Sequence, residues 1–307
     1  MGRAVVVTGA NSGIGRATAL ELARVGYDVS GTARTAAKAG SLVAAAGERG
    51  LTLRTVLCDV ADAASTAAAF AEIAGLTGGG PWAVVTNAGI AQSGALEDVS
   101  DADARHQLEV NLVAPVRIAR LVLPGMRERG DGRIVNVSSV AGRVATPMMG
   151  CYAASKAGLE AASNALRIEV EAFGVRVVLV EPGGFGTGIW DDGQQRLPAG
   201  QDGPYADAYR RAHAGTGRLG ALLPDPVWVA RVVRVALGSP VPLPRYRVGA
   251  DAVGLVLNAK LLPTMVTDRV KALAAGLARL PFAGRAAHQT AAYNDTGPGP
   301  AAAARKW

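Results

Sequence analysis

The sequence predicts an α/β domain in which a parallel sheet of about seven strands carries helices on both faces. Strand-like runs rich in valine alternate with segments of helical periodicity, which is typical of a doubly wound parallel sheet. The valine runs are continuous rather than alternating, as expected of strands buried on both faces. With 307 residues, 50% of them hydrophobic, the chain is long enough for one large domain or two small ones.

The expected strands are short and are separated by segments of helical length. They lie at 4–8, 28–33, 51–57, 81–89, 132–139, 174–183 and 244–250. The first of the intervening helices is the apolar-periodic segment at 15–25, which follows the first strand after a glycine turn. We therefore expect a single catalytic domain over 1–250.

Three regions interrupt this alternation. The segment 188–226 is rich in Gly, Pro, Gln and Asp and contains Trp190, Tyr205 and Tyr209. It is too long for an ordinary connection, which predicts a lid over the substrate site. The segment 251–282 is expected to form a helical extension, and 283–307, rich in Ala, Gly and Pro, a flexible tail.

The extension contains two amphipathic helices separated by Pro263. Their apolar faces must be covered by the pocket mouth, a sister subunit or lipid. We favour the protein itself or a sister subunit, because no basic cluster borders the first helix as it would in a membrane-surface helix. The alternative is that these helices merely thicken the core.

Charge and cysteine content exclude several classes of protein. Lysine and arginine outnumber the acidic residues by 32 to 25, but no short window is mostly basic, so we expect no nucleic-acid partner. Cys58 and Cys151 form no disulfide framework, and the isolated histidines predict no metal site. No apolar run reaches about 18 residues, and the N-terminal run is too short for a signal peptide. We therefore expect a cytoplasmic protein without a transmembrane segment.

The stretch TGANSGIG at 8–15 follows the first expected strand and opens the first expected helix. Its glycines, Gly9, Gly13 and Gly15, allow a tight turn, the close approach of a phosphate, and close packing of the helix on the sheet. The start of the helix then offers unpaired N–H groups to an anion. The stretch predicts a site for the phosphates of a nucleotide, with a merely tight turn as the alternative.

A basic residue follows the second expected strand. Arg34 comes directly after Ala33, Lys38 lies nearby, and no acidic residue occurs from Ser30 to Ser41. A free ribose 2′-hydroxyl is usually bound by a carboxylate in this region, whereas a 2′-phosphate is bound by arginine. The sequence thus favours NADP(H), and a solvated surface arginine is the alternative.

A tyrosine and a lysine stand four residues apart in CYAASKAGLE at 151–160. Residues with this spacing share one face of a helix, so Tyr152 and Lys156 would point into the same space. Tyrosine has a pKa of about 10, and a nearby cation can lower it by about 1–3 units. The phenol could then exchange a proton near neutral pH. The alternative is a half-exposed tyrosine and a solvated lysine on a surface helix.

The motifs occur together in an order that resembles the short-chain dehydrogenase/reductase family. They are TGANSGIG at 8–15, CDV at 58–60, NAG at 87–89, Asn111 in VNLVAP, NVSS at 136–139, YAASK at 152–156 and PGGFGT at 182–187. The matches extend from Arg3 to about Ala250, and their joint order is far more specific than any single motif. The resemblance implies a Rossmann-type fold with one active site at the carboxyl ends of the strands.

The resemblance also implies roles for individual residues. Tyr152 matches the family's catalytic acid/base, and Lys156 matches its activator, which also holds the nicotinamide ribose. Ser139 matches the serine that hydrogen-bonds the substrate oxygen, whereas Ser138 should point to the opposite face. Asn111 matches the fourth member of the tetrad. The implied cofactor-binding residues are Gly9, Asn11, Ser12, Gly13, Ile14, Gly15, Arg34, Asp59, Val60, Asn87, Ala88, Gly89, Tyr152, Lys156, Pro182, Gly183 and Thr187. The expected substrate contacts are Ser139, Tyr152 and Trp190.

A proline follows Asn111 in the same expected helix. Pro115 lies four residues later and has no N–H for the Asn111 carbonyl. That carbonyl is then free to hold a water, as the family's proton relay from lysine to solvent requires. An ordinary proline kink is the alternative.

The resemblance implies hydride transfer between NADP(H) and a carbonyl compound or secondary alcohol. The stretches 26–35 and 159–184 are similar to the branch that contains hydroxysteroid and retinol dehydrogenases, which implies a lipophilic substrate. Two alternatives are a non-enzymatic NADP(H)-binding sensor and an enzyme that uses the cofactor for epimerisation or dehydration. Retention of the four residues of the tetrad argues against the sensor. We also expect a homo-oligomer, either a dimer or a tetramer.

Overall fold

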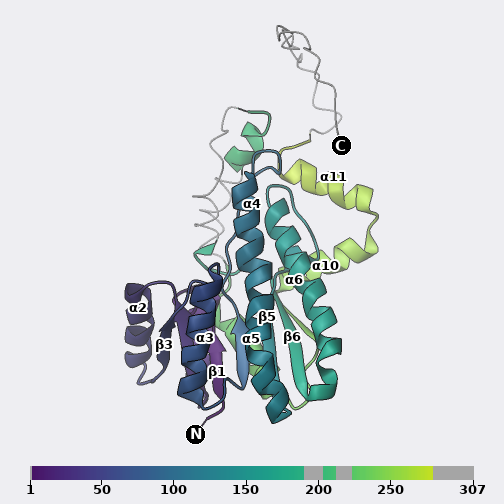
Figure 1. The fold of residues 1–307 in the computed structure, drawn as a ribbon. Coiled ribbons are helices and arrows are strands. Elements are labelled where there is room, and N and C mark those ends of the chain that lie inside the picture. Colours follow the sequence, from purple (N-terminus) through teal and green to yellow (C-terminus); the bar gives the residue numbers. More distant parts are fainter. Residues whose placement is uncertain (1, 190–202, 212–222, 279–307) are drawn as a thin grey trace, which may run out of the picture.

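The structure is a computed structural model that describes residues 2–189, 203–211 and 223–278 (Figure 1). Two predictions fall outside the described residues. They are the substrate contact at Trp190 and the tail at 283–307. The segment 188–226 is described only in part.

In the described part of the chain, seven parallel strands form one sheet with the order β3-β2-β1-β4-β5-β6-β7. The strands are β1 (Ala4–Val7), β2 (Asp28–Ala33), β3 (Arg54–Leu57), β4 (Ala83–Thr86), β5 (Gly132–Val137), β6 (Val175–Pro182) and β7 (Arg245–Val248). The predicted doubly wound parallel sheet is confirmed. The strand order reverses between β1 and β4, and in such sheets ligands bind at the carboxyl ends of the strands beside this point.

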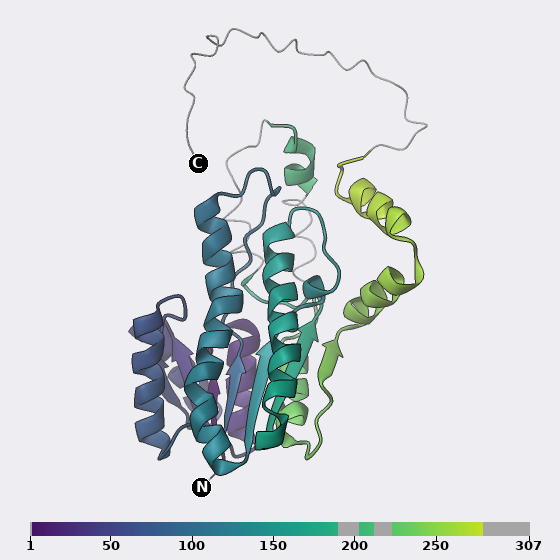
Figure 2. The same cartoon turned by 45° about the vertical axis from the view of Figure 1, so that its right-hand side comes forward.

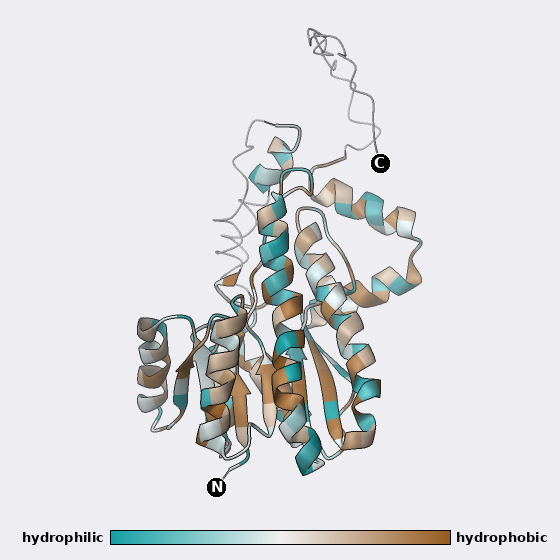
Figure 3. Cartoon of the chain, in the orientation of Figure 1, coloured by the Kyte–Doolittle hydropathy of each residue, from teal (hydrophilic) through white to brown (hydrophobic). Residues whose placement is uncertain are grey.

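Helices cover both faces of the sheet, and each face has its own hydrophobic core. One face carries α1 (Gly13–Arg24), α2 (Ala36–Gly47) and α9 (Val227–Gly238). The other carries α3 (Ala63–Thr77), α5 (Ala114–Arg129) and α6 (Gly150–Glu169). The central strands are buried on both sides, and every residue of β4 and β5 is buried. This explains the short apolar runs in these strands, which appear brown in Figure 3.

A long helix in three parts begins beyond the pocket end of the sheet and runs back toward the start of β5 (Figure 1). It begins as α4 (Asp101–Leu108), which Ser100 caps by accepting a hydrogen bond from the Asp103 N–H (3.1 Å). It widens into a π-helical turn, η1 (Glu109–Val113), and continues as α5. Such turns are often found at functional sites, and Asn111 lies within this one.

The extension forms two helices, α10 (Ala250–Leu261) and α11 (Thr264–Ala274), separated at Pro263 as predicted. They project from the end of β7 and stand away from the sheet (Figure 2). Only Ala252 and Val256 of α10 are buried, and α11 has no buried residue. Of the covers expected for the apolar faces, the described part of the chain therefore supplies none that buries α11, and a sister subunit stays a prediction. Helix α10 thus adds two side chains to the buried hydrophobic residues, whereas α11 adds none.

None of the helices in the described ranges combines the length and the apolarity that a membrane span requires.

Candidate active site

A pocket of about 450 Å³ opens at the carboxyl ends of β1, β4 and β5. Most of the residues predicted from the sequence line it. They are Gly9, Asn11, Ser12, Gly13, Ile14, Arg34, Asp59, Val60, Asn87, Ala88, Gly89, Ser139, Tyr152, Lys156, Pro182, Gly183 and Thr187. Gly15 and Asn111 are not among the lining residues, although both support it from behind.

The glycine loop has a backbone that only glycine adopts easily. Gly9 and Gly13 have φ values of 63° and 50°, in the left-handed region. A Cβ on Gly15 would lie 2.2 Å from the Gly9 carbonyl oxygen and 2.4 Å from Nδ2 of Asn87. Gly15 therefore lets α1 pack closely against the loop, while the other two glycines shape the floor of the pocket.

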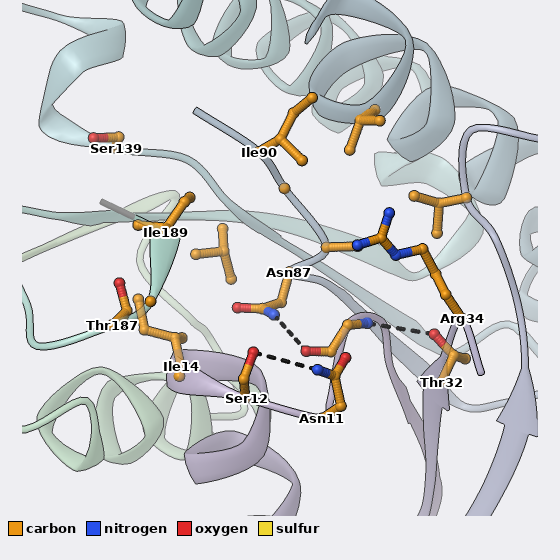
Figure 4. A pocket seen from close by; sticks show the side chains of 18 of the residues that line it. Asn11, Ser12, Ile14, Thr32, Arg34, Asn87, Ile90, Ser139, Thr187 and Ile189 are labelled. Atoms are coloured by element: carbon orange, nitrogen blue, oxygen red, sulfur yellow. Dashed lines mark hydrogen bonds between the residues drawn. The ribbon is translucent and has the colours of Figure 1, made fainter. Parts of the chain in front are cut away.

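The end of β4 is tied to this loop by hydrogen bonds. Thr8 Oγ1 accepts from the N–H groups of Asn87 and Ala88, each at 3.0 Å, and Asn87 Nδ2 donates to the Thr8 carbonyl at 3.0 Å. The Gly9 N–H donates to Thr32 Oγ1 at 3.3 Å (Figure 4). The loop is thus held to its neighbouring strands on both sides, which pre-organises it for a ligand.

The start of α1 fits a phosphate-bearing cofactor. Its N-cap residue, Ser12, makes no side-chain cap hydrogen bond, so the first N–H groups of the helix are not satisfied by a cap. Ser12, Gly13 and Ile14 all line the pocket. An uncapped helix start beside a glycine turn suits the diphosphate of a nicotinamide dinucleotide.

Two cations lie at the rim of the pocket beyond β2. Arg34 and Lys38 are exposed and line the pocket, and within the described ranges neither forms an ion pair. Figure 4 shows the Arg34 side chain extending along the pocket. Asp59 lines the same end, and its Oδ1 accepts a hydrogen bond from the Ala61 N–H (3.0 Å). The cations give this end of the pocket the charge that a phosphate requires.

Tyr152 and Lys156 are buried on one face of α6, with 5% and 4% of their surface exposed. Lys156 Nζ donates to the carbonyl oxygen of Val137 (2.9 Å), the last residue of β5, and lies 5.9 Å from the centre of the Tyr152 ring. Burial lowers the pKa of Lys156 to about 8, and the nearby Glu160 carboxylate opposes that shift. The lysine therefore titrates close to neutral pH.

The prediction that Lys156 lowers the pKa of Tyr152 is wrong for this structure. Burial raises the pKa of the phenol above its ordinary value, and a hydrogen bond with Ser139 only partly opposes that rise. Desolvation is the largest cause, because the phenolate would lose much of its hydration at this buried position. The phenol is thus held in its protonated form.

The two neighbouring serines after β5 point in different directions. Ser139 Oγ accepts from the Ala141 N–H (3.1 Å), which caps the short helix η2 (Val140–Gly142), and it lies beside Tyr152. Ser138 Oγ instead donates to Glu160 Oε1 (3.2 Å). This divergence follows from the alternation of side chains in extended backbone.

Asn111 is completely buried and acts on backbone and side-chain groups rather than on the pocket. Its Nδ2 donates to the Ile90 carbonyl (2.9 Å) and to Ser155 Oγ (3.0 Å), while its Oδ1 accepts from the Ile90 N–H (3.0 Å). It thereby joins the segment after β4 to α6. The π-helical turn around it ends just before Pro115, which has no N–H to donate to the Asn111 carbonyl.

Sequence reasoning missed further residues near the pocket, among them Asp251 and His106. Asp251, at the start of α10, accepts from the Gly184 N–H (2.6 Å), and a Cβ on Gly183 would lie 2.2 Å from its carboxylate. It therefore holds the segment after β6 in place. His106 of α4 also lines the pocket. Neither residue belongs to a motif, so the sequence carried no signal for them.

Two aromatic residues of the expected lid, Tyr205 and Tyr209, make contacts outside the pocket. Tyr209 is buried, and its hydroxyl donates to Asp98 Oδ2 (2.6 Å) and accepts from the Ala95 N–H (3.1 Å). Tyr205 donates to Glu97 Oε2 (2.7 Å). Neither tyrosine lines the pocket. They anchor the segment 203–211 to the loop between β4 and α4.

Metal chemistry has no support in the described part of the chain. No group of three or more His, Cys, Asp or Glu side chains there could hold a metal ion. Cys58 and Cys151 are free thiols, and burial raises the pKa of each.

Comparisons with known proteins agree with this geometry. The family model described as short chain dehydrogenase matches residues 3–197. A 3-ketodihydrosphingosine reductase of Bacteroides thetaiotaomicron is 34% identical over 68% of this chain and 73% of its own length. Retinol dehydrogenase 5 of Homo sapiens is 35% identical over 87% of this chain and 86% of its own length.

Solved structures show the same fold. A short-chain dehydrogenase from Streptomyces avermitilis superposes with a TM-score of 0.73 at 33% identity, covering 89% of this chain and 95% of that one. A metagenomic short-chain oxidoreductase in complex with NADP gives a TM-score of 0.64 at 26% identity, covering 80% of this chain and 96% of that one. The chain belongs to the short-chain dehydrogenase/reductase family, whose members use nicotinamide cofactors, and it is an oxidoreductase.

Proposed function

We propose that this oxidoreductase uses NADP(H) to interconvert a lipophilic ketone or aldehyde with the corresponding alcohol. The observation that carries the proposal is the meeting of three side chains with the glycine loop in one pocket. Ser139, Tyr152 and Lys156 line the same pocket as Gly9 and Gly13. This places a proton donor beside a site suited to a dinucleotide.

The pocket offers a partner for each part of the cofactor. The glycine loop and the start of α1 would hold the diphosphate, and Arg34 with Lys38 would hold the 2′-phosphate. Lys156 would donate to the nicotinamide ribose. At one end of the pocket, Asp59 would bind the adenine. At the other end, Thr187 and the segment before it would bind the carboxamide. When bound, the nicotinamide supplies or accepts a hydride.

The preference for the 2′-phosphate rests on charge. Arg34 and Lys38 line the pocket rim, and no acidic residue occurs from Ser30 to Ser41. A carboxylate at this position would repel the phosphate and favour a free ribose. The solved metagenomic oxidoreductase in complex with NADP gives further support.

Tyr152 would act as the acid in the reductive direction. Its raised pKa keeps the phenol protonated at neutral pH, so a proton is available for the oxygen of the carbonyl substrate. The Lys156 ammonium would stabilise the phenolate that forms as the proton leaves. Ser139 accepts its hydrogen bond from Ala141 and can direct its own hydroxyl hydrogen to the same substrate oxygen.

Asn111 would be a positioning residue. Its side chain is fully engaged with Ile90 and Ser155, and the latter lies in α6 directly before Lys156. We propose that Asn111 fixes the lysine relative to the segment beside the cofactor. Its carbonyl, which Pro115 cannot bond, would hold the water of a proton relay to solvent.

A lipophilic substrate is supported by the names of two relatives. A 3-ketodihydrosphingosine reductase carries a ketone substrate in its name, and a retinol dehydrogenase carries an alcohol substrate. Both substrates have long hydrocarbon chains.

We also propose a homo-oligomer in which a sister subunit covers the apolar face of α11, where Met265 and Val270 are 84% and 59% exposed.

The test is the oxidation of NADPH by the purified protein in the presence of a panel of ketones and aldehydes of increasing chain length. We expect kcat/KM to rise with the length of the apolar chain and to be higher with NADPH than with NADH. Binding of NADPH without turnover of any carbonyl would favour the sensor or epimerase alternatives. Absence of NADPH binding would contradict the proposal entirely.

A further inference from the structure

A buried carboxylate lies one helical turn beyond Lys156. Glu160 of α6 is 3% exposed, and it takes no part in the chemistry described above. Its Oε1 accepts from Ser138 Oγ (3.2 Å), and its Oε2 accepts from Arg245 Nη1 (2.7 Å) and Arg143 Nη1 (3.4 Å). A buried charge with several partners is costly unless each of them is well placed.

These partners come from different elements around the site. Ser138 precedes the serine that bonds Tyr152, Arg143 follows the short helix η2, and Arg245 begins β7. Close packing supports this arrangement, because a Cβ on Gly142 would lie 2.9 Å from Glu160 Oε1. Glu160 therefore ties α6 to the loop that carries Ser139 and to the far strand of the sheet.

The charges that face Glu160 form a small network. Arg245 also pairs with Glu181 of β6, which is completely buried, and Arg247 pairs with Glu181 at 3.2 Å. Arg143 is partly exposed, with 36% of its side chain in contact with solvent. Lys156 lies on the same face of α6 as Glu160 but forms its hydrogen bond with Val137.

We propose that Glu160 is a positioning residue that keeps Lys156 protonated and fixes the loop bearing Ser139. This role of Glu160 rests on the proposed function, in which Lys156 donates to the cofactor ribose and stabilises the Tyr152 phenolate. Glu160 touches neither the cofactor site nor the substrate site and acts only through these neighbours.

The negative charge of Glu160 fixes the direction in which this residue shifts the pKa of Lys156. Burial lowers the pKa of Lys156 and the Glu160 carboxylate raises it, with a result of about 8. Glu181 is not among the groups that shift this pKa. Loss of the Glu160 charge would lower the lysine pKa further, and the ammonium would then lose its proton at a lower pH.

The first test follows NADPH binding by fluorescence as a function of pH. In Glu160→Gln, which keeps the shape and one acceptor oxygen, the pH above which binding weakens should fall by about one unit. Arg143→Gln removes a partly screened cation from beside the same carboxylate. In this variant the pH above which NADPH binding weakens should rise by about a few tenths of a unit. Glu181→Gln is the matched control, and in it the pH above which NADPH binding weakens should be the same as in the wild type.

The second test needs no cofactor. Below the lysine pKa, Glu160→Gln leaves a buried ammonium without its anion, whereas above that pKa the lysine is neutral and only the loss of the arginine and Ser138 contacts remains, which is the same at both pH values. The loss of unfolding free energy caused by Glu160→Gln should therefore be greater at pH 6 than at pH 9, by about the tenfold change in equilibrium constant that one pKa unit represents. In a Lys156→Met background this pH dependence should disappear.

The two tests separate the proposal from the function on which it rests. If wild-type protein does not bind NADPH, the proposed function fails, and the unfolding cycle still decides the role of Glu160. The proposal would be overturned if Glu160→Gln left the pH above which NADPH binding weakens unchanged. It would also be overturned if Glu181→Gln shifted that pH as much as Glu160→Gln does. If Glu160→Gln does not fold, Arg143→Gln decides, and the absence of an upward shift there would overturn it.

Discussion

Lys156 Nζ lies 5.9 Å from the centre of the Tyr152 ring, and the two buried side chains share one face of α6. The ammonium is held by the carbonyl of Val137 at the end of β5, so its position relative to the phenol is set by the sheet. A lysine in this place can act on the phenol and on a ribose in the same pocket. Substitutions of this pair and of its surroundings can test how the site works.

Replacement of Arg34 tests the cofactor preference. Arg34→Ala should lose the preference for NADPH over NADH while NADH binding persists, because only the 2′-phosphate needs the guanidinium. An arginine–phosphate interaction is worth roughly 1.5–3 kcal/mol, which is about ten- to a hundredfold in Kd. Calorimetric titration with both cofactors measures this, with Arg120→Ala on the exposed surface of α5 as the control. Equal affinities of the wild type for both cofactors would contradict the assignment.

The pKa of Lys156 predicts how cofactor affinity depends on pH. In the proposed function the protonated lysine donates to the ribose, and the pKa of Lys156 in the free protein is about 8. NADPH affinity should therefore be constant at lower pH and fall as the pH rises through about 8. In Lys156→Ala both turnover and affinity should drop, and this decline above pH 8 should vanish. A decline that persists in the variant would assign it to another group.

Asp251 should matter for cofactor geometry although it lies in α10. Asp251→Ala removes the acceptor from the Gly184 N–H, so the segment that follows β6 would lose its anchor. We expect a fall in kcat of about tenfold with a smaller loss of NADPH affinity, since this is the segment that we propose to hold the carboxamide. The exposed Asp268 of α11 provides a control, and Asp268→Ala should behave as wild type.

Truncation tests the extension, and the structure fixes where the chain can be cut. A cut after Ala250 would remove Asp251 and the buried contacts of α10, whereas a cut after Leu262 removes only α11 and the residues C-terminal to it. The protein truncated after Leu262 should still bind NADPH. We expect it to elute at a smaller size in gel filtration and to turn over long-chain substrates less efficiently. An unchanged oligomer size would contradict the assignment of α11 to a subunit contact.

Local patterns predicted the sheet well, because short continuous valine runs between segments of helical periodicity are typical of parallel strands buried on both faces. The strand at 28–33 matches β2 completely, and the other six expected strands each overlap an observed strand. The position of the glycine loop between β1 and α1 also followed from its place in the sequence. Helix α1 begins two residues earlier than expected, at Gly13, because the turn itself supplies its first residues.

Contacts between distant segments could not be predicted in this way. Asp251 and Gly184 are separated by 67 positions, and nothing near either residue marks the other as a partner. The pKa of Tyr152 was predicted in the wrong direction for the same reason. The spacing to Lys156 is visible in the sequence, but the burial that raises the pKa of Tyr152 results from packing of the whole site.

The role of Tyr152 as proton donor is tested most directly by Tyr152→Phe, which keeps the ring and removes the transferable proton. The affinity for NADPH and the fold of the substrate-free protein should be unchanged. The kcat for carbonyl reduction should fall by about 10²–10⁴-fold, the usual contribution of general acid catalysis. Paired measurements of the NADPH dissociation constant and of NADPH oxidation with an active ketone decide this. A variant that binds NADPH normally but has lost turnover is the predicted result. Near-normal turnover would show that another group delivers the proton.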